Sequence, residues 1–433
     1  MVRAAIEHLP VLVPGAEVAG AVLLGGGEKL AGTLDAGVPV VVGDTAVDGL
    51  THGLVRFTPD LVYDLSDEPV VDARLRLRLA AQALLAGVAY QGADFRIDPP
   101  PRPRVATKPT IAVIGTGKRT GKTAVSAHLA RTLGEPPVVV AMGRGGPPEP
   151  EVIDPATFDL SAQGLVALAE SGRHAASDHL EDALTAGVVT IGTRRCGGGL
   201  AGAPVDSTFE VGVEVANARP ERLIVLEGSG AAIPPVHADV TVCVVPATAD
   251  PELVAGYLGA YKLLLADVIV LTMADAGAGP VLQTVRRLVP DTPTVETVLR
   301  PTPLEPIGGR RAFYVTTAPE SAGAILVDHL ESQHGATIIG TSHNLARRPQ
   351  LAQDLYGIGQ ADVVLVELKA AGVDVVARAA LAAGRDVVFC DNRVVTIGGD
   401  GTFEMLVQQA ANLAEERFDA RGSEGALMGR MQR

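Results

Sequence analysis

A nine-residue segment at positions 115–123, Gly-Thr-Gly-Lys-Arg-Thr-Gly-Lys-Thr, constrains the fold of this chain more than any other feature. It follows a short apolar run at 110–114, which predicts a β-strand, and precedes a run at 124–130 that predicts a helix. Strand, glycine-rich turn, Gly-Lys-Thr and helix together form the context that a phosphate-binding loop requires. The N–H groups of such a turn and of the following helix N-terminus make a concave anion site. The segment therefore predicts a nucleoside triphosphate site.

Several side chains of this loop have expected roles. Lys122 is expected to reach the β- and γ-phosphates, and the Thr123 hydroxyl to bind Mg²⁺. Lys118 is a second lysine inside the loop, and we expect it to assist Lys122 in catalysis. The residues expected to hold the nucleotide here are Gly115, Thr116, Gly117, Lys118, Arg119, Thr120, Gly121, Lys122 and Thr123.

The amino-acid composition indicates the fold class and excludes some kinds of binding partner. With 433 residues the chain is too long for a single core, and 47% hydrophobic with 20% charged residues suits an α/β protein with a buried parallel sheet. A formal net charge of −14 argues against nucleic acid and membrane surfaces as partners. An acidic protein that binds an anion must concentrate its few cations at the site. Clustered Arg and Lys residues are therefore informative here.

Cysteine usage indicates a reducing compartment. Cys196, Cys243 and Cys390 lie far apart and lack metal-ligand spacing, and Cys243 and Cys390 fall in apolar runs typical of buried thiols. No signal peptide and no apolar run near 18 residues is evident. We therefore expect a cytoplasmic protein.

The chain is expected to contain three α/β domains. A proline-rich connector at 98–103 separates an N-terminal α/β domain, 1–105, from a nucleotide-binding core, 106–300. A second proline-rich stretch at 301–306 opens a C-terminal α/β domain, 301–433, that could act as a lid. The N-terminal segment has apolar runs at 21–24 and 38–42 and a helical pattern over 70–88.

The core is expected to be a doubly wound, mostly parallel sheet. Helical stretches separate continuous Val, Ile and Leu runs, which is the pattern of a parallel α/β sheet. The strands predicted for the core are 110–114, 138–142, 188–193, 223–226, 240–245 and 268–272, and those of the C-terminal domain are 312–315, 337–340, 363–366 and 387–389. Ligands of such sheets lie beyond the carboxyl ends of the strands.

An acid and several cations follow these strands. Glu227 comes directly after a buried strand and is expected to order Mg²⁺, which favours one or two carboxylates plus phosphate oxygens. Arg144, Arg194 and Arg195 follow two other strands, and with Lys118 and Arg119 they place five cations at one sheet edge. Because guanidinium groups pair strongly with phosphate, this predicts a second, strongly anionic substrate.

Other candidates carry weaker signals. His179 is a possible phosphate donor, and Asp178 or Asp182 could hold a metal-bound water. Thr272 and Met273 end the last core strand, where P-loop folds often contact the base. No Asn-Lys-x-Asp motif supports guanine, so ATP is expected. In the C-terminal domain, Lys369 either adds positive charge to the nucleotide site when this domain closes over it, or lies in a surface loop without a role in binding.

The chain resembles the cyclic 2,3-diphosphoglycerate synthetase family, with a core similar to dethiobiotin synthetase. The loop reads Gly-Thr, four residues, then Gly-Lys-Thr, and it is accompanied by Met-Gly-Arg-Gly-Gly-Pro-Pro-Glu-Pro-Glu at 142–151, Arg-Arg-Cys-Gly-Gly-Gly at 194–199 and Glu-Gly-Ser-Gly at 227–230. The resemblance spans most of the chain. It implies a cytoplasmic enzyme, expected to be a homodimer, that uses ATP and Mg²⁺.

The implied reaction joins the two phosphates of 2,3-diphosphoglycerate to give the cyclic anhydride, ADP and phosphate. The resemblance then implies that Lys122, Lys118, Glu227 and Arg144 are catalytic, and that the metal is bound by Thr123 and Glu227. The substrate would be held by Arg119, Arg144, Arg194, Arg195, His179 and Lys369. Alternatives are a small-molecule kinase, such as one acting on 2-phosphoglycerate, a carboxylate ligase, or a non-enzymatic nucleotide switch.

Overall fold

The computed structural model of the protein describes residues 2–25 and 36–431. These residues form two compact units. The first comprises residues 1–101 with two later segments, 249–265 and 280–291. The second comprises 102–248, 266–279 and 292–433. The predicted division at 105 and 300 stays a prediction, because these units group the residues by contact and divide the chain elsewhere.

The first unit is built from short strands and amphipathic helices. Its elements are α1 (Val2–Leu12), β1 (Ala21–Leu23), β2 (Val40–Val42), α2 (Ala46–Phe57), β3 (Leu61–Tyr63), α3 (Ala73–Leu85), β4 (Ala89–Gln91), β5 (Arg96–Ile97), α8 (Pro251–Ala255), α9 (Gly259–Leu264) and most of α10 (Gly279–Leu288). The parallel strands β1 and β2 form one small sheet, and β3, β4 and β5 form another. The predicted helix at 70–88 is present as α3, which begins at the N-cap Asp72, whose side chain accepts from the backbone N–H of Leu75.

The second unit contains a single 13-stranded sheet. Its strands are β6 (Thr110–Gly115), β7 (Val138–Gly143), β8 (Glu151–Ile153), β9 (Thr190–Cys196), β10 (Asp206–Ser207), β11 (Ile224–Glu227), β12 (Val240–Pro246), β13 (Val268–Thr272), β14 (Thr294–Pro303), β15 (Arg311–Val315), β16 (Thr337–Ser342), β17 (Val363–Glu367) and β18 (Asp386–Gly399). The helices are α4 (Lys122–Thr132), α5 (Ala162–Glu170), α6 (Asp178–Ala186), α7 (Phe209–Asn217), α11 (Gly323–His334), α12 (Arg348–Asp354), α13 (Arg378–Ala382) and α14 (Phe403–Met431).

The core strands are parallel, as predicted. The order β9-β7-β11-β6-β12-β13-β14 is parallel throughout, so the carboxyl ends of these strands share one edge. Helices α4 and α14 pack with one face, against residues such as Val139 and Val225. Helix α7 covers the other face, where a Cβ at Gly212 would lie 3.2 Å from Val140. The doubly wound α/β fold is therefore confirmed.

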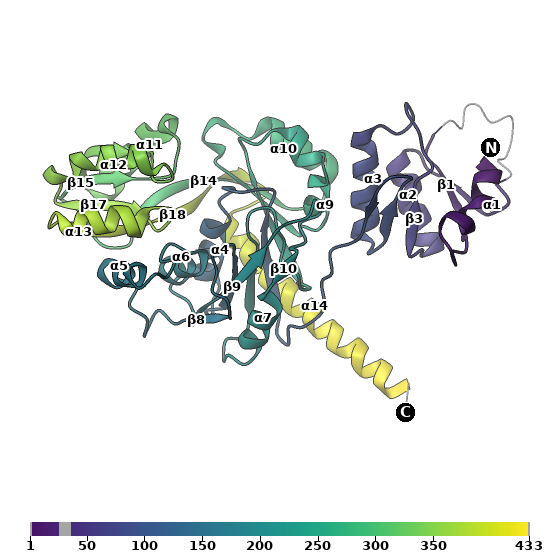
Figure 1. Ribbon diagram of the computed structural model, residues 1–433, viewed down its shortest axis with the longest axis horizontal. Coiled ribbons are helices and arrows are strands. Elements are labelled where there is room, and N and C mark those ends of the chain that lie inside the picture. The colour runs from purple at the N-terminus through teal and green to yellow at the C-terminus, as the bar shows by residue number, and fades with distance from the viewer. Residues whose placement is uncertain (1, 26–35, 432–433) are drawn as a thin grey trace. The chain divides into compact units, whose positions relative to one another are not determined.

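The long strands β14 and β18 join the core to the C-terminal strands (Figure 1). The predicted C-terminal domain begins at the proline-rich stretch 301–306, and Pro301 and Pro303 of this stretch lie within β14. Proline is tolerated there because β13 pairs with β14 only as far as Glu296, so beyond that residue only the β18 side of β14 is paired. Strand β9 is also longer than predicted, because Arg194 pairs with Gly143 of β7 and β10 extends the pairing at Arg195 and Cys196.

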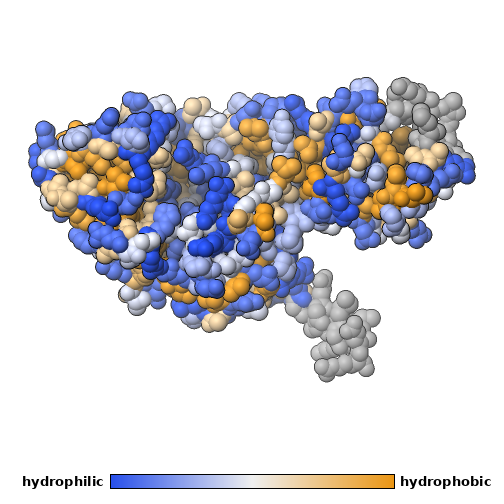
Figure 2. All heavy atoms as spheres, viewed as in Figure 1, coloured by the Kyte–Doolittle hydropathy of each residue, from blue (hydrophilic) through white to orange (hydrophobic). Residues whose placement is uncertain are grey.

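Surface and thiol features complete the fold. On the face seen in Figure 2, hydrophobic side chains are mixed with hydrophilic ones. Across the described ranges, every helix is too short or too polar to cross a bilayer. Cys243 and Cys390 are buried, as expected, while Cys196 is exposed, and none of the three forms a disulfide within the described residues.

Candidate active site at the phosphate loop

The phosphate loop has the predicted strand–turn–helix form. It leaves β6 at Gly115 and enters α4 at Lys122, with Gly121 as N-cap at a φ of 88°. This left-handed conformation favours glycine. A Cβ at Gly115 would lie 2.6 Å from the Thr120 hydroxyl, so this position also needs glycine for the loop to fold back closely. The turn thereby directs its N–H groups and the α4 N-terminus at one concave surface.

Lys122 lies across the loop. Its side chain is buried, and its Nζ donates to the carbonyl of Gly117 at 3.3 Å and that of Gly230 at 3.0 Å. Burial lowers the pKa of Lys122, while Glu227 opposes that shift. Carbonyl oxygens are weaker partners for an ammonium group than phosphate oxygens are. Lys122 is therefore positioned to exchange these carbonyls for nucleotide phosphates.

Thr123 and Glu227 are brought together as the sequence suggested. The Thr123 hydroxyl donates to Oε1 of Glu227 at 3.0 Å, from the first turn of α4 to the last residue of β11. The Glu227 side chain is 2% exposed, and its Oε2 lacks a hydrogen-bond partner within the described chain. Burial raises the pKa of Glu227. A buried carboxylate oxygen without a donor is suited to accept a cation.

Helix α6 adds three more acids to this site. Asp178, Glu181 and Asp182 are spaced so that they share one face of α6, and Asp182 faces Glu227. Asp182 is fully buried, and both of its oxygens lack partners in the described ranges. Burial and the Glu227 carboxylate raise the pKa of Asp182. Of these acids sequence reasoning missed Glu181, although the helical spacing was visible in the sequence.

A metal would need ligands from the nucleotide as well. Over residues 2–25 and 36–431, no three His, Cys, Asp or Glu side chains come together as a complete metal site. The unpartnered oxygens of Glu227 and Asp182 nevertheless fit Mg²⁺, which is usually held by one or two carboxylates together with substrate phosphates.

Two of the predicted arginines are engaged by backbone carbonyls. Arg195 is buried and donates to Gly197 O at 2.6 Å and Ser229 O at 3.0 Å. Arg194 Nε donates to Gly146 O at 2.8 Å. These bonds tie together the glycine-rich loops that follow β7, β9 and β11. Arg195 also leaves its Nε without a partner in the described residues, so it retains a free donor.

The other cations are exposed at the same sheet edge. Arg144 follows β7, and its charge is close enough to contribute to the lowered pKa of Arg195, after the larger effect of burial. Lys118 and Arg119 are exposed in the loop, where Arg119 has a φ of 62°. The structure therefore places exposed positive charge both in the phosphate loop and in the loop that follows β7.

The remaining predicted residues have distinct surroundings. His179 is buried against Gly192, with Nε2 at 3.6 Å from Oε2 of Glu151. The Thr272 hydroxyl donates to Thr120 O at 2.7 Å, which ties β13 to the loop, and Met273 has a φ of 57°. Lys369 Nζ lies 2.9 Å from Glu181 Oε1.

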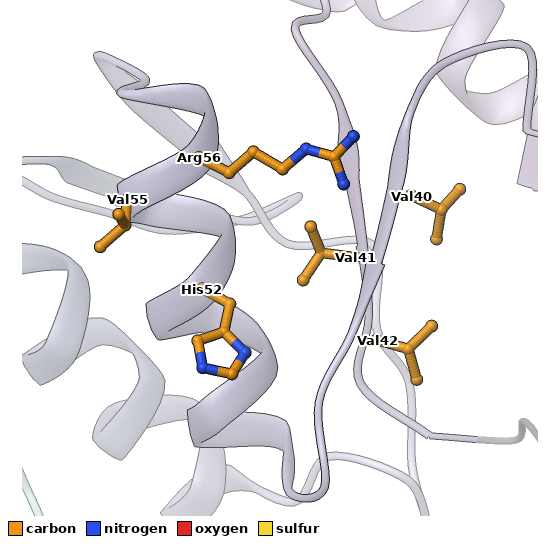
Figure 3. Close-up of a pocket in the computed structure, with 6 residues that line it drawn as sticks. All are labelled: Val40, Val41, Val42, His52, Val55 and Arg56. Atoms are coloured by element: carbon orange, nitrogen blue, oxygen red, sulfur yellow. The ribbon is translucent and has the colours of Figure 1, made fainter.

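A separate pocket lies in the first unit (Figure 3). Its volume is about 510 Å³, and it lies between β2 and α2. The residues that line it are Val40, Val41, Val42, His52, Val55 and Arg56. Figure 3 shows the Arg56 and His52 side chains reaching from α2 toward β2. None of the predicted site residues lines this pocket.

The fold and the loop define a P-loop nucleotide-binding α/β protein. Sequence models of three domains of cyclic 2,3-diphosphoglycerate synthetase match this chain: the N-terminal domain at residues 1–98, the P-loop domain at 110–298 and the C-terminal domain at 303–393. The chain therefore belongs to the cyclic 2,3-diphosphoglycerate synthetase family, a family of enzymes.

Full-length relatives agree with this assignment. The protein named cyclic 2,3-diphosphoglycerate synthetase from Rubrobacter xylanophilus is 46% identical over 405 residues, which is 92% of either chain. The proteins of that name from Thermococcus gammatolerans and Methanothermus fervidus are 44% and 40% identical, over 95% of this chain and 97% and 93% of theirs. The family resemblance predicted from the sequence is thus confirmed.

Proposed function

We propose that this enzyme uses ATP to close the phosphoanhydride ring of 2,3-diphosphoglycerate, releasing cyclic 2,3-diphosphoglycerate, ADP and phosphate. The observation that carries the proposal is the juxtaposition of a buried phosphate-loop lysine, the Thr123–Glu227 pair and exposed cations at one sheet edge. That arrangement suits one nucleotide and a second polyanion held next to it.

The reaction would proceed in two displacements. An oxygen of one substrate phosphate attacks the γ-phosphorus of ATP, the bond from that phosphorus to the bridging oxygen breaks, and ADP leaves. The neighbouring substrate phosphate then attacks the substrate phosphorus that now bears the transferred group. This closes the ring and expels the former γ-phosphoryl group as orthophosphate. Both steps bring anions together, so positive charge must be fixed beforehand.

The residues divide between the two anions. Lys122 and Lys118 would bind the ATP phosphates, and Thr272 and Met273 would lie toward the base. Arg144 would bind 2,3-diphosphoglycerate and Arg119 would serve either anion. Arg194, Arg195 and His179 remain substrate candidates, and the carbonyl bonds of both arginines support a role in shaping the loops that receive it.

Mg²⁺ would be held by Thr123 and Glu227, with Asp182 next to them. When bound, it supplies charge neutralisation at the phosphate oxygens. The acids themselves argue for this requirement. A triphosphate bound beside Lys122 would lie close to Glu227 and Asp178, which both act electrostatically on that lysine. A bound cation would offset the repulsion between these acids and the phosphates.

We also propose that the enzyme acts in the cytoplasm as a homodimer, and that residues 301–433 form a domain that closes on the site. Free thiols support the first point. The ion pair between Lys369 of this segment and Glu181 of the acid cluster supports the proposed closure of the C-terminal domain.

Product analysis tests the reaction. The purified chain is incubated with ATP, Mg²⁺ and 2,3-diphosphoglycerate, and the products are followed by ³¹P NMR. The proposal predicts a cyclic anhydride and free phosphate in equal amounts. A kinase would leave the γ-phosphate on its substrate, and a nucleotide switch would hydrolyse ATP regardless of added phosphoglycerate. Either result would contradict the proposal.

A further inference from the structure

Lys369 is presented by an unusual turn at the carboxyl end of β17. Its backbone N–H donates to Glu367 O at 2.8 Å, and the next residue, Ala370, has a φ of 48° although it is not glycine. The following π-helix, at 372–377, begins at Gly372, where a Cβ would lie 2.3 Å from Glu367 O. Such a strained backbone persists where the surrounding structure enforces it, and it is often found at functional sites.

Glu367 holds this strained turn in place through hydrogen bonds. Its buried carboxylate accepts from the hydroxyls of Thr316 and Thr317, each at 2.7 Å, from Thr317 N at 3.0 Å and from Asn392 Nδ2 at 3.1 Å. These donors come from the end of β15 and from β18. The carboxylate therefore fixes the turn that carries Lys369 to the two neighbouring strands.

The turn faces the phosphate-loop site. Strands β15, β16 and β17 run parallel to β18, and β18 runs antiparallel to β14 and hence to the core strands. The carboxyl ends of the two sets of strands are therefore directed toward each other, and α6 lies where they meet (Figure 1). Lys369 Nζ pairs there with Glu181, and its charge contributes to the lowered pKa of Lys122, after burial.

An ion pair that served only to stabilise the fold would not need a strained turn held in place by a buried carboxylate. Lys369 is 30% exposed, so an incoming ligand can reach its ammonium group, and Glu181 is shared with a cluster that is already rich in carboxylates. Phosphate oxygens bind ammonium groups at least as well as a carboxylate does. The Glu181 contact thus resembles a resting position.

We propose that Lys369 is a further catalytic lysine, in addition to the loop lysines Lys118 and Lys122. During phosphoryl transfer from ATP, the Lys369 ammonium group leaves Glu181 and binds the phosphoryl group. This inference rests on the proposed function in that it takes ATP as phosphoryl donor. Lys122 then approaches the group from the P-loop, and Lys369 approaches it from the C-terminal strands. The catalytic site is therefore complete only when both lysines bind the phosphoryl group.

The test compares the binding of ADP with that of ADP plus aluminium fluoride, a mimic of the transferring phosphoryl group, by calorimetry in the presence of Mg²⁺. For Lys369→Met we expect unchanged ADP affinity and a loss of most of the additional affinity that the fluoride confers. The kcat of the same variant should fall about 100-fold, as for loss of one fixed donor to a transition state, with a KM for ATP within threefold. Arg378→Met, which removes an exposed ion pair with Glu170 in the same segment, serves as the matched control.

Two further variants separate catalysis from structure. Lys369→Arg keeps the charge and should retain part of the fluoride-dependent affinity, which preserves the test if the methionine variant does not fold. Glu181→Gln leaves the lysine in place and should retain most of that affinity. If Glu181→Gln and Lys369→Met lose it equally, or neither does, Lys369 is only an ion-pair partner. Absence of cyclic product from the wild-type enzyme would end the proposed function but not this comparison, which needs no acceptor substrate.

Discussion

Single side chains define the chemistry of this site. Lys122 and the Thr123–Glu227 pair were predictable because each follows from a local motif, a glycine-rich turn or an acid at the end of a buried strand. The Lys369–Glu181 pair was not predictable, because its partners are separated by nearly half the chain and depend on the reversed direction of the C-terminal strands. His179 shows the opposite case, since a polar residue near a site motif packs against a strand glycine and pairs with Glu151.

Replacing Lys122 tests the phosphate loop. Lys122→Met should lower kcat by at least 100-fold, because a buried ammonium positioned on the triphosphate stabilises charge that develops in the transition state. Steady-state release of ADP measures this. Arg222→Met removes an exposed cation that pairs with Glu135 at 3.8 Å and should change kcat by less than twofold. If the two variants had comparable kcat values, Lys122 would have no role in catalysis.

Asp64 tests a buried charge of the first unit. Burial raises its pKa, but hydrogen bonds from Ser66, Tyr90 and Arg76 outweigh burial and the net shift is downward. The carboxylate therefore stabilises the fold above pH 3.8, its ordinary value, and this stability is lost as the pH falls toward the lower folded pKa.

Asp64→Asn should accordingly reduce the free energy of unfolding by about 1–3 kcal/mol at pH 7, since it removes the charge that accepts hydrogen bonds from Arg76, Ser66 and Tyr90. Urea unfolding followed by circular dichroism should show this gap shrinking at pH 2.5. Asp98→Asn breaks only the exposed pair with Arg96 and should leave the free energy of unfolding nearly unchanged at either pH. A gap for Asp64→Asn that does not depend on pH would refute the electrostatic explanation.

Strands and helices followed from hydrophobic pattern wherever that pattern was continuous. Runs of Val, Ile and Leu located the core strands, because a parallel sheet is buried on both faces. The hydrophobic pattern did not predict the full length of β14, since Pro301 and Pro303 are typical of connectors. Proline is compatible with this strand because the β13 side of β14 is unpaired beyond Glu296. The extension of β9 depended on long-range pairing, of Arg194 with β7 and of Arg195 and Cys196 with β10, which the hydrophobic pattern could not reveal.

The loop after β7 offers a test at the level of these elements. A Cβ at Gly146 would lie 2.0 Å from Thr193 O, and Gly146 O accepts from Arg194 Nε. Gly146→Ala must therefore displace the loop, and we expect a loss of about 1–3 kcal/mol of stability from overpacking. The KM for the phosphoglycerate should rise several-fold more than the KM for ATP.

Thermal unfolding and initial rates measure these two effects. The control is Gly134→Ala, because an added Cβ there meets no atom within 4 Å. Equal changes in the two KM values would show that the loop does not belong to the second anion site.

The chain as a whole combines an acidic surface with one concentrated anion site. Because the net charge is −14 and acidic side chains lie beside the phosphate loop, we expect ATP binding to require a cation. Activity should then vanish with a chelator and return with Mg²⁺. One sheet carries both the phosphate loop and the Lys369 turn, although sequence patterns suggested separate domains. Pattern alone could not show that two sets of strands face each other, because direction is set by long-range pairing.

The order of bond formation is the most direct test of this account. The substrate is prepared with ¹⁸O in its phosphate groups, and the released orthophosphate is analysed by mass spectrometry. If a substrate phosphate first accepts the γ-phosphoryl group, each orthophosphate carries one ¹⁸O atom, and cyclic product forms in equal amount. Orthophosphate that carries only oxygen from ATP and water, or release of orthophosphate without ring closure, would contradict the account.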